Sequence, residues 1–133
     1  MIRVYIDGAS AGDPGPSGAG IYYINERGET VRQAFKLTDM SNHEAEFYAL
    51  LYALKVLRKD GNRAAAFYTD SQLVDDAVND GKVKNRAYQP VLESILKASA
   101  DFDLFFVNWV PSSKNREADQ LARKAIHEGE SPP

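Results

Sequence analysis

Residues 41–70 read SNHEAEFYALLYALKVLRKDGNRAAAFYTD, and they combine a capped helix with a following strand. Ser41 is a preferred N-cap residue, and Glu44 three places on completes a capping box. Leucines then recur at spacings of three and four, which predicts a helix over 42–59 with one apolar face. A glycine ends this helix, and a strand is predicted over 64–69. A helix placed between strands favours a crossover connection, and therefore an α/β fold.

Three strands are expected before this helix. Alternating apolar residues predict them over 2–7, 19–25 and 29–37. Residues 8–18 form a loop of small residues and turn formers, and Glu26-Arg27-Gly28 is typical of a hairpin turn. The chain is therefore predicted to open with a three-stranded antiparallel meander.

After the fourth strand, we expect two short helices, a strand and a last helix, over 71–79, 89–99, 103–109 and 115–127. The order βββαβααβα indicates an α/β fold with a five-stranded mixed sheet and helices on both faces. The first, fourth and fifth strands should run parallel, and a site is expected beyond their carboxyl ends. Three aromatic residues of the fifth strand are predicted to lie in the core: Phe105, Phe106 and Trp109.

The composition is typical of a soluble globular protein. The chain has 133 residues, of which 44% are hydrophobic and 26% charged. We assign residues 1–128 to a single domain and 129–133 to a frayed tail. No apolar stretch has membrane-spanning length, and the N-terminus reads as a strand rather than a signal peptide, so a cytoplasmic location is expected.

The cysteine count and the net charge limit the kinds of functional site that this chain can have. The absence of cysteine excludes disulfides, zinc–thiolate sites and cysteine nucleophiles. The net charge of −3 and the pI of about 5.4 argue against nucleic-acid binding through a broad basic surface. They are compatible with a protein that meets a polyanion through metal ions and a few local contacts.

Four acidic residues stand where strands are predicted to end or helices to begin. Asp7 and Asp70 each end a predicted strand, and Glu46 and Asp119 lie early in helices, on or beside the apolar side. A lone charge beside apolar sequence is costly to bury, and hard divalent cations prefer carboxylate oxygens. We therefore interpret the four as a metal site, although Asp7 alone could start a turn and Asp70 alone could cap a helix. Glu44 competes with Glu46, but its capping-box position favours a structural role.

The chain resembles the type 1 ribonuclease H family through four motifs, whose order and spacing match over nearly the whole chain. Each motif alone is weakly specific, whereas the four together are quite specific. They are DGAS at 7–10 with GDPGPSG at 12–18, SNHEAEFYAL at 41–50, TDSQLV at 69–74, and WVP at 109–111 with NREADQLA at 115–122.

This resemblance implies a ribonuclease H-like fold and hydrolysis of the RNA strand of RNA–DNA hybrids. It also implies that the acidic quartet is catalytic and holds two Mg²⁺ ions roughly 4 Å apart, with Mn²⁺ as a substitute. One ion would orient and activate the attacking water, and the other would stabilise the leaving 3′-oxygen, giving 5′-phosphate and 3′-hydroxyl ends. The implied partner is the hybrid, without a membrane or an obligatory protein partner, and the protein is expected to be a monomer. The quartet is Asp7, Glu46, Asp70 and Asp119.

The resemblance further implies that 2′-hydroxyls are read from the minor groove of the hybrid. The family uses the backbone of the glycine-rich loop, an Asn at the start of the first helix and a Gln after the third carboxylate. Asn and Gln suit this task because each offers a donor and an acceptor, although this Asn could merely assist helix capping. The corresponding residues are Gly8, Ala9, Ser10, Asn42 and Gln72.

Two accessory parts that are common in the family are reduced in this sequence. Residues 111–115, before the fourth carboxylate, are short and hold no histidine, and we interpret His43 and His127 as ordinary exposed side chains. Residues 80–86 stand where many members have a basic helical protrusion, and Asp13 stands where Asn is frequent. The resemblance is therefore to compact members, and we expect a modest nuclease with weak, salt-sensitive hybrid binding.

Two other interpretations stay open at this point. One is a catalytically weak or silent ribonuclease H-like nucleic-acid-binding module, which the low pI and the missing histidine favour. Retention of four mutually repelling carboxylates opposes it. The other is a nuclease of the same fold that acts on a different nucleic acid, such as duplex RNA.

Overall fold

The elements follow the predicted order in the computed structural model, which describes residues 1–133. The strands are β1 (Ile2–Ser10), β2 (Gly15–Ile24), β3 (Thr30–Met40), β4 (Ala64–Thr69) and β5 (Leu104–Trp109). The helices are α1 (Asn42–Lys59), α2 (Gln72–Asp80), α3 (Gln89–Ser99) and α4 (Arg116–Glu128). Two single-turn 3-10 helices, η1 (Arg86–Tyr88) and η2 (Ser112–Lys114), precede α3 and α4.

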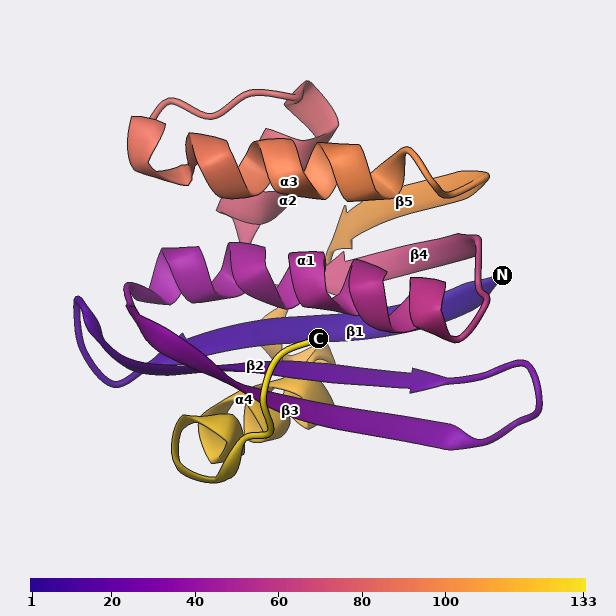
Figure 1. The fold of residues 1–133 in the computed structure, drawn as a ribbon, viewed down its shortest axis with the longest axis horizontal. Coiled ribbons are helices and arrows are strands. Elements are labelled where there is room, and N and C mark those ends of the chain that lie inside the picture. Colours follow the sequence, from indigo (N-terminus) through magenta and orange to yellow (C-terminus); the bar gives the residue numbers. More distant parts are fainter.

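The strands form one mixed sheet in the order β3-β2-β1-β4-β5 (Figure 1). β1 pairs with β2, and β2 with β3, in antiparallel fashion, whereas β1–β4 and β4–β5 are parallel. The prediction of an antiparallel meander joined to parallel strands is confirmed. β1 and β2 extend into the predicted loop, because Ser10 pairs with Ser17 there.

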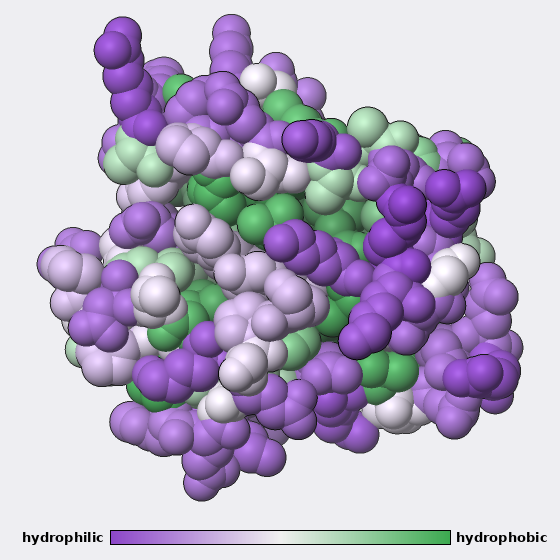
Figure 2. Space-filling model, in the orientation of Figure 1, coloured by the Kyte–Doolittle hydropathy of each residue, from purple (hydrophilic) through white to green (hydrophobic).

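Helices cover both faces of the sheet, as predicted. α1 packs against β1 and β2 on one face, and α3 packs on α1 (Figure 1). α4 packs against β1, β2 and β3 on the opposite face. The face that carries α1 and α3 is largely hydrophilic, with hydrophobic surface left between these two helices (Figure 2). None of the helices combines the length and apolarity needed to cross a membrane.

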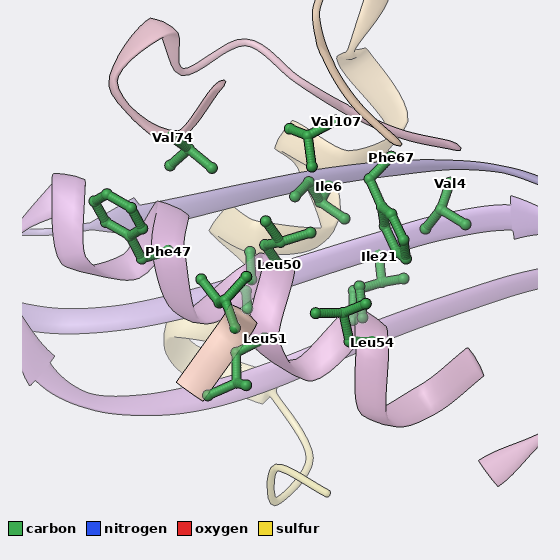
Figure 3. Packing of buried hydrophobic residues seen from close by; sticks show 14 of the residues in the cluster. Val4, Ile6, Ile21, Phe47, Leu50, Leu51, Leu54, Phe67, Val74 and Val107 are labelled. Carbon is green, nitrogen blue, oxygen red and sulfur yellow. The ribbon is translucent and has the colours of Figure 1, made fainter. Parts of the chain in front are cut away.

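The main core lies between α1 and the sheet. Leu50 and Leu54 of α1 point toward Ile6, Ile21 and other apolar strand residues, and these four named side chains are almost fully buried (Figure 3). The helix takes this position because its apolar face matches the apolar side of β1 and β2. Its start is held by Ser41 and the side chain of Glu44, which form the predicted capping box.

β5 corrects one prediction about the core. Phe105 is partly buried against Phe67, but Phe106 is 47% exposed and Trp109 is 46% exposed. β5 is an edge strand, and its residues alternate between two faces. Phe106 points to the face that α4 covers only over β1 to β3, so no helix buries it. Trp109 ends the strand and donates from its indole N–H to the carbonyl of Asp70 at 3.2 Å.

The segment 129–133, expected to be a frayed tail, includes a residue that is held by the sheet. The N–H of Glu130 donates to the carbonyl of Ala34 at 2.8 Å, and its carbonyl accepts from the N–H of Lys36 at 2.9 Å. Glu130 therefore pairs with the outer edge of β3.

Two glycines allow the helices to approach the sheet closely near the end of β1. A Cβ on Gly8 would overlap the backbone of Ala45 in α1. A Cβ on Gly20 of β2 would overlap the carbonyl of Ala118 and lie 2.6 Å from the backbone nitrogen of Ala122 in α4. The absence of these side chains brings the starts of α1 and α4 toward the same region of the sheet.

Candidate active site

Asp7 and Asp70 lie side by side because β1 and β4 are parallel neighbours. Tyr5 pairs with Tyr68 in the register, and each carboxylate comes two residues later. β1 continues beyond Asp7, so this residue does not start a turn. Ser71 accepts a hydrogen bond from the N–H of Val74 and caps α2, so Asp70 is not the N-cap. Asp7 therefore does not have the turn role, and Asp70 does not have the capping role, that its sequence context alone would allow.

Glu46 completes a cluster of three carboxylates. It lies early in α1 and is only 8% exposed, next to the close approach at Gly8. One oxygen from each of Asp7, Glu46 and Asp70 lies within 4.8 Å of the others. Glu44 stays in the capping box, so its structural role is confirmed. The three grouped oxygens are the hard ligands that Mg²⁺ and related cations prefer.

Asp119 lies beside this cluster, in the first turn of α4. Its side chain is 38% exposed, and Oδ1 accepts a hydrogen bond from Nε of Arg123 at 3.1 Å. Asp119 shares a cavity of about 680 Å³ with Asp7, Glu46 and Asp70. The structure thus brings all four predicted carboxylates to one cavity, with three of them in the tightest group.

The electrostatics of the cluster follow from burial and mutual repulsion. Burial first, then the charge of Asp70 and contacts with Asp119, raise the pKa of Asp7 to about 9. Burial also raises the pKa of Glu46, although His43 and Ser71 oppose the shift. The pKa of Asp70 is raised by burial and by the nearby Asp119 charge. Charged carboxylates are costly here without a cation, so the residues present fit a divalent metal site.

The glycine-rich loop and Asn42 reach this cavity. Gly8, Ala9, Ser10 and Asn42 all line it. The Ser10 hydroxyl donates to the carbonyls of Gly12 and Met40 at 2.6 and 2.7 Å, so it holds the loop rather than reaching freely into the cavity. Asn42 donates from Nδ2 to Glu46 at 3.3 Å. These predicted substrate-binding residues are therefore placed beside the carboxylates.

Gln72 is placed differently from the other predicted substrate-binding residues. Its Nε2 lies 3.0 Å from Asp76 and 3.4 Å from Asp75 in its own helix, and it does not line the cavity. The side chain turns along α2 because two acceptors stand three and four residues ahead of it.

The two histidines include one that contacts the site. His43 is exposed, as expected, but Nδ1 lies 3.3 Å from Glu46, three residues along α1. Its spacing on the helix would have indicated this contact. The segment 111–115 brings no histidine to the cavity, since it holds none.

Three further residues of α4 and its N-cap were not assigned a role from the sequence. Asn115 is fully buried and donates from Nδ2 to the carbonyl of Ile6 at 2.8 Å, which ties the start of α4 to β1. Its Oδ1 has no hydrogen-bond partner within the protein. Arg116 and Arg123 line the cavity on either side of Asp119. Their spacing, three before and four after Asp119, was the available signal that they share its helix face.

Known proteins resemble this chain over nearly its whole length. A family model described as reverse transcriptase-like matches residues 5–125. The putative hydrolase EbsB of Enterococcus faecalis is 37% identical over 128 residues, covering 95% of this chain and 94% of the relative. A ribonuclease H of Desulforamulus reducens is 30% identical over 137 residues, covering 91% of this chain and 84% of the relative.

Solved structures show the same architecture. The RNase H1 of the halophilic archaeon Halobacterium salinarum has a TM-score of 0.88 and 28% identity, covering 96% of this chain and 98% of that one. LC11-RNase H1, isolated from compost by a metagenomic approach and solved in complex with an RNA/DNA hybrid, has a TM-score of 0.85 and 27% identity. That match covers 95% of this chain and 96% of the other. The likeness therefore includes the sheet, the helices and the strand ends that carry the carboxylates.

Proposed function

The chain belongs to the ribonuclease H family, in a compact form, and from this premise we propose that it hydrolyses the RNA strand of RNA–DNA hybrids by a two-metal-ion mechanism. The products would carry 5′-phosphate and 3′-hydroxyl ends. We propose Mg²⁺ as the cation, with Mn²⁺ able to replace it, and a monomer as the active unit, because all four carboxylates of the site come from one chain.

The main support for this proposal is the grouping of the acidic side chains. Oxygens of Asp7, Glu46 and Asp70 lie within 4.8 Å of one another, and Asp119 borders the same cavity. Bound divalent cations would supply the charge neutralisation that the attacking and leaving oxygens of a phosphodiester require. The four side chains would hold these cations from β1, from the end of β4, and from the early turns of α1 and α4.

The chain's own residues support attack by water rather than by a side chain. There is no cysteine, and the hydroxyl of Ser10, the serine of the loop that follows Asp7, is engaged by two backbone carbonyls. Attack of water on phosphorus, with the 3′-oxygen leaving, produces the proposed 5′-phosphate and 3′-hydroxyl ends. Carboxylate oxygens that line the cavity, such as those of Asp7 and Asp70, can accept hydrogen bonds from this water and orient it.

Recognition of the hybrid is proposed to depend on the loop after Asp7 and on Asn42. The backbone of Gly8, Ala9 and Ser10 borders the cavity, where it can meet the 2′-hydroxyls that distinguish RNA from DNA. The LC11-RNase H1 complex supports this assignment at the level of substrate class, because that relative binds an RNA/DNA hybrid. We keep Gln72 as a weaker candidate, since binding would require its side chain to leave Asp76.

Cleavage of labelled duplexes tests the proposal. The protein is incubated with an end-labelled RNA–DNA hybrid, duplex RNA and duplex DNA, each with Mg²⁺ or Mn²⁺. We expect cleavage of the hybrid RNA alone, and loss of cleavage in Asp70→Asn. Asp103→Asn is the matched control, because this exposed carboxylate lies just before β5, at the opposite end of the sheet.

Absence of cleavage at high enzyme concentration with either metal would overturn the proposal. Retained hybrid binding in that case would identify a silent nucleic-acid-binding module. Cleavage of duplex RNA at a comparable rate would instead identify a nuclease with a different substrate class.

A further inference from the structure

α4 presents two arginines to the catalytic cavity, and only one of them is paired with a carboxylate. Arg123 donates to Asp119 at 3.1 Å. Arg116 takes part in none of the five ion pairs of the structure, and it is exposed at the wall of the cavity. Arg116 is therefore the free cation beside the four carboxylates.

The adjacent acid does not neutralise Arg116. The carboxylate of Glu117 turns to Arg32 of β3, with Oε2 3.4 Å from Nε. Ser112 and Ser113, which also line the cavity, form no side-chain hydrogen bonds within the protein. Arg116 thus stands with two free hydroxyls, which is a donor set suited to an oxyanion.

Helix stability does not explain a cation at this position. Arg116 is the first residue of α4, where the helix dipole disfavours positive charge. No side chain caps this helix: Nδ2 of Asn115, the N-cap residue, donates to the carbonyl of Ile6, and its Oδ1 accepts no hydrogen bond from the helix. A residue that is locally unfavourable and faces a functional cavity indicates a role in binding.

Arg116 lines two neighbouring cavities. Besides the catalytic cavity, it lines a smaller one of about 210 Å³ with Tyr5, Tyr22 and Lys114. A nucleic-acid strand with its scissile phosphate at the carboxylates would pass Arg116 as it leaves them. The strand needs a cation there, since four carboxylates repel the phosphates on either side of the reaction centre.

We propose that Arg116, with Ser112 and Ser113, binds a phosphate of the RNA strand next to the scissile one. This inference rests on the proposed function and adds a substrate-positioning residue to it. The planar guanidinium can donate two parallel hydrogen bonds to the phosphate, which an ammonium group cannot match.

Steady-state kinetics of three variants test the inference. Arg116→Gln is expected to raise KM for the hybrid about tenfold and to leave kcat within about twofold, as for loss of one charge-assisted contact. Arg116→Lys should retain the charge but not the paired geometry, with a rise in KM of about threefold. Lys124→Gln is the control, because it removes one charge from the exposed side of the same helix, outside both cavities.

The salt dependence of hybrid binding provides a second readout. Binding is measured in the Asp70→Asn background, where cleavage is absent. Loss of one phosphate contact should reduce the slope of log Kd against log salt by about 0.9 in Arg116→Gln. Lys124→Gln should keep the slope.

The outcomes separate this inference from the proposed function. Cleavage by the unmodified protein, with the same KM and salt slope in Arg116→Gln and Lys124→Gln, would overturn the role of Arg116 alone. A protein that neither cleaves nor binds the hybrid would overturn both. A loss of kcat without a change in KM would assign Arg116 to the chemical step and would also contradict phosphate anchoring.

Discussion

Nε of Arg123 lies 3.1 Å from Oδ1 of Asp119, one helical turn earlier in α4. This contact gives Asp119 an arginine partner, which Asp7, Glu46 and Asp70 lack. The guanidinium offsets the negative charge of this fourth carboxylate, which lies beside the group formed by the other three. Arg123 is thus a positioning residue for Asp119.

Replacing Arg123 should therefore affect turnover more than stability. We expect Arg123→Gln to lower kcat about tenfold, as for other residues that orient a ligand. Its melting temperature should change little, since the ion pair is solvent-exposed. The measurement is kcat and KM alongside thermal unfolding, with Lys124→Gln as control. An unchanged kcat would show that Asp119 needs no such orientation.

The stability of the metal-free protein should depend on pH through Asp7. The pKa of Asp7 rises from 3.8 to about 9, so between these values the folded state holds a proton that the unfolded chain releases. The free energy of unfolding contributed by Asp7 is full below pH 3.8 and is lost as pH rises toward 9. The raised pKa values of Glu46 and Asp70 act in the same direction.

Thermal unfolding in a chelator checks this dependence. The melting temperature should fall as pH rises from about 5 to 9, and the fall should be shallower in Asp7→Asn, which carries no titratable group there. The same steepness in both proteins would contradict the buried, protonated Asp7.

Magnesium should stabilise the protein most where the carboxylates are ionised. At a concentration about a hundredfold above Kd, binding adds about 2.7 kcal/mol to the free energy of unfolding, or roughly 5–10 °C in melting temperature. The shift should be larger at pH 8 than at pH 5, because protons compete with the cation for Asp7. Asp7→Asn should lose most of the shift, and an equal shift in that variant would place the bound ion elsewhere.

Gly20→Ala should separate α4 from the sheet. Its Cβ would meet the backbone of Ala118 and Ala122, which flank Asp119, at overlapping distances. We expect a loss of about 1–3 kcal/mol in the free energy of unfolding and a clear fall in kcat, measured by urea denaturation and by hybrid cleavage.

Gly28→Ala provides the matched comparison for Gly20→Ala. Gly28 lies in the β2–β3 hairpin with φ of +79°, and a Cβ there would meet no atom within 4 Å. Backbone strain should still destabilise this variant by about 1–2 kcal/mol, but its kcat should be normal at temperatures where it is folded. Equal effects of the two variants on kcat would show that docking of α4 is not what places Asp119.

Local sequence signals predicted the elements whose stability is local. The bounds of α1 and β4 agree with the prediction, because a capping box, a leucine stripe and a short apolar run mark them. The extension of β1 to Ser10 was missed, since residues 8–18 have turn chemistry and only pairing with β2 reveals them as strand. Phe106 was misplaced because hydrophobicity does not reveal that β5 is an edge strand with one face uncovered.

The sequence by itself determined the order of the elements and the presence of acidic residues just beyond the parallel pairing of β1 and β4 and early in two helices. Periodicity, capping and turn chemistry are properties of neighbouring residues, so they can be read along the chain. Only the tertiary structure decided that three carboxylates group tightly, and that Asp119 and Arg116 of α4 line the same cavity. These outcomes depend on close helix–sheet approaches at Gly8 and Gly20, and both ion pairing and pKa shifts change steeply over such distances.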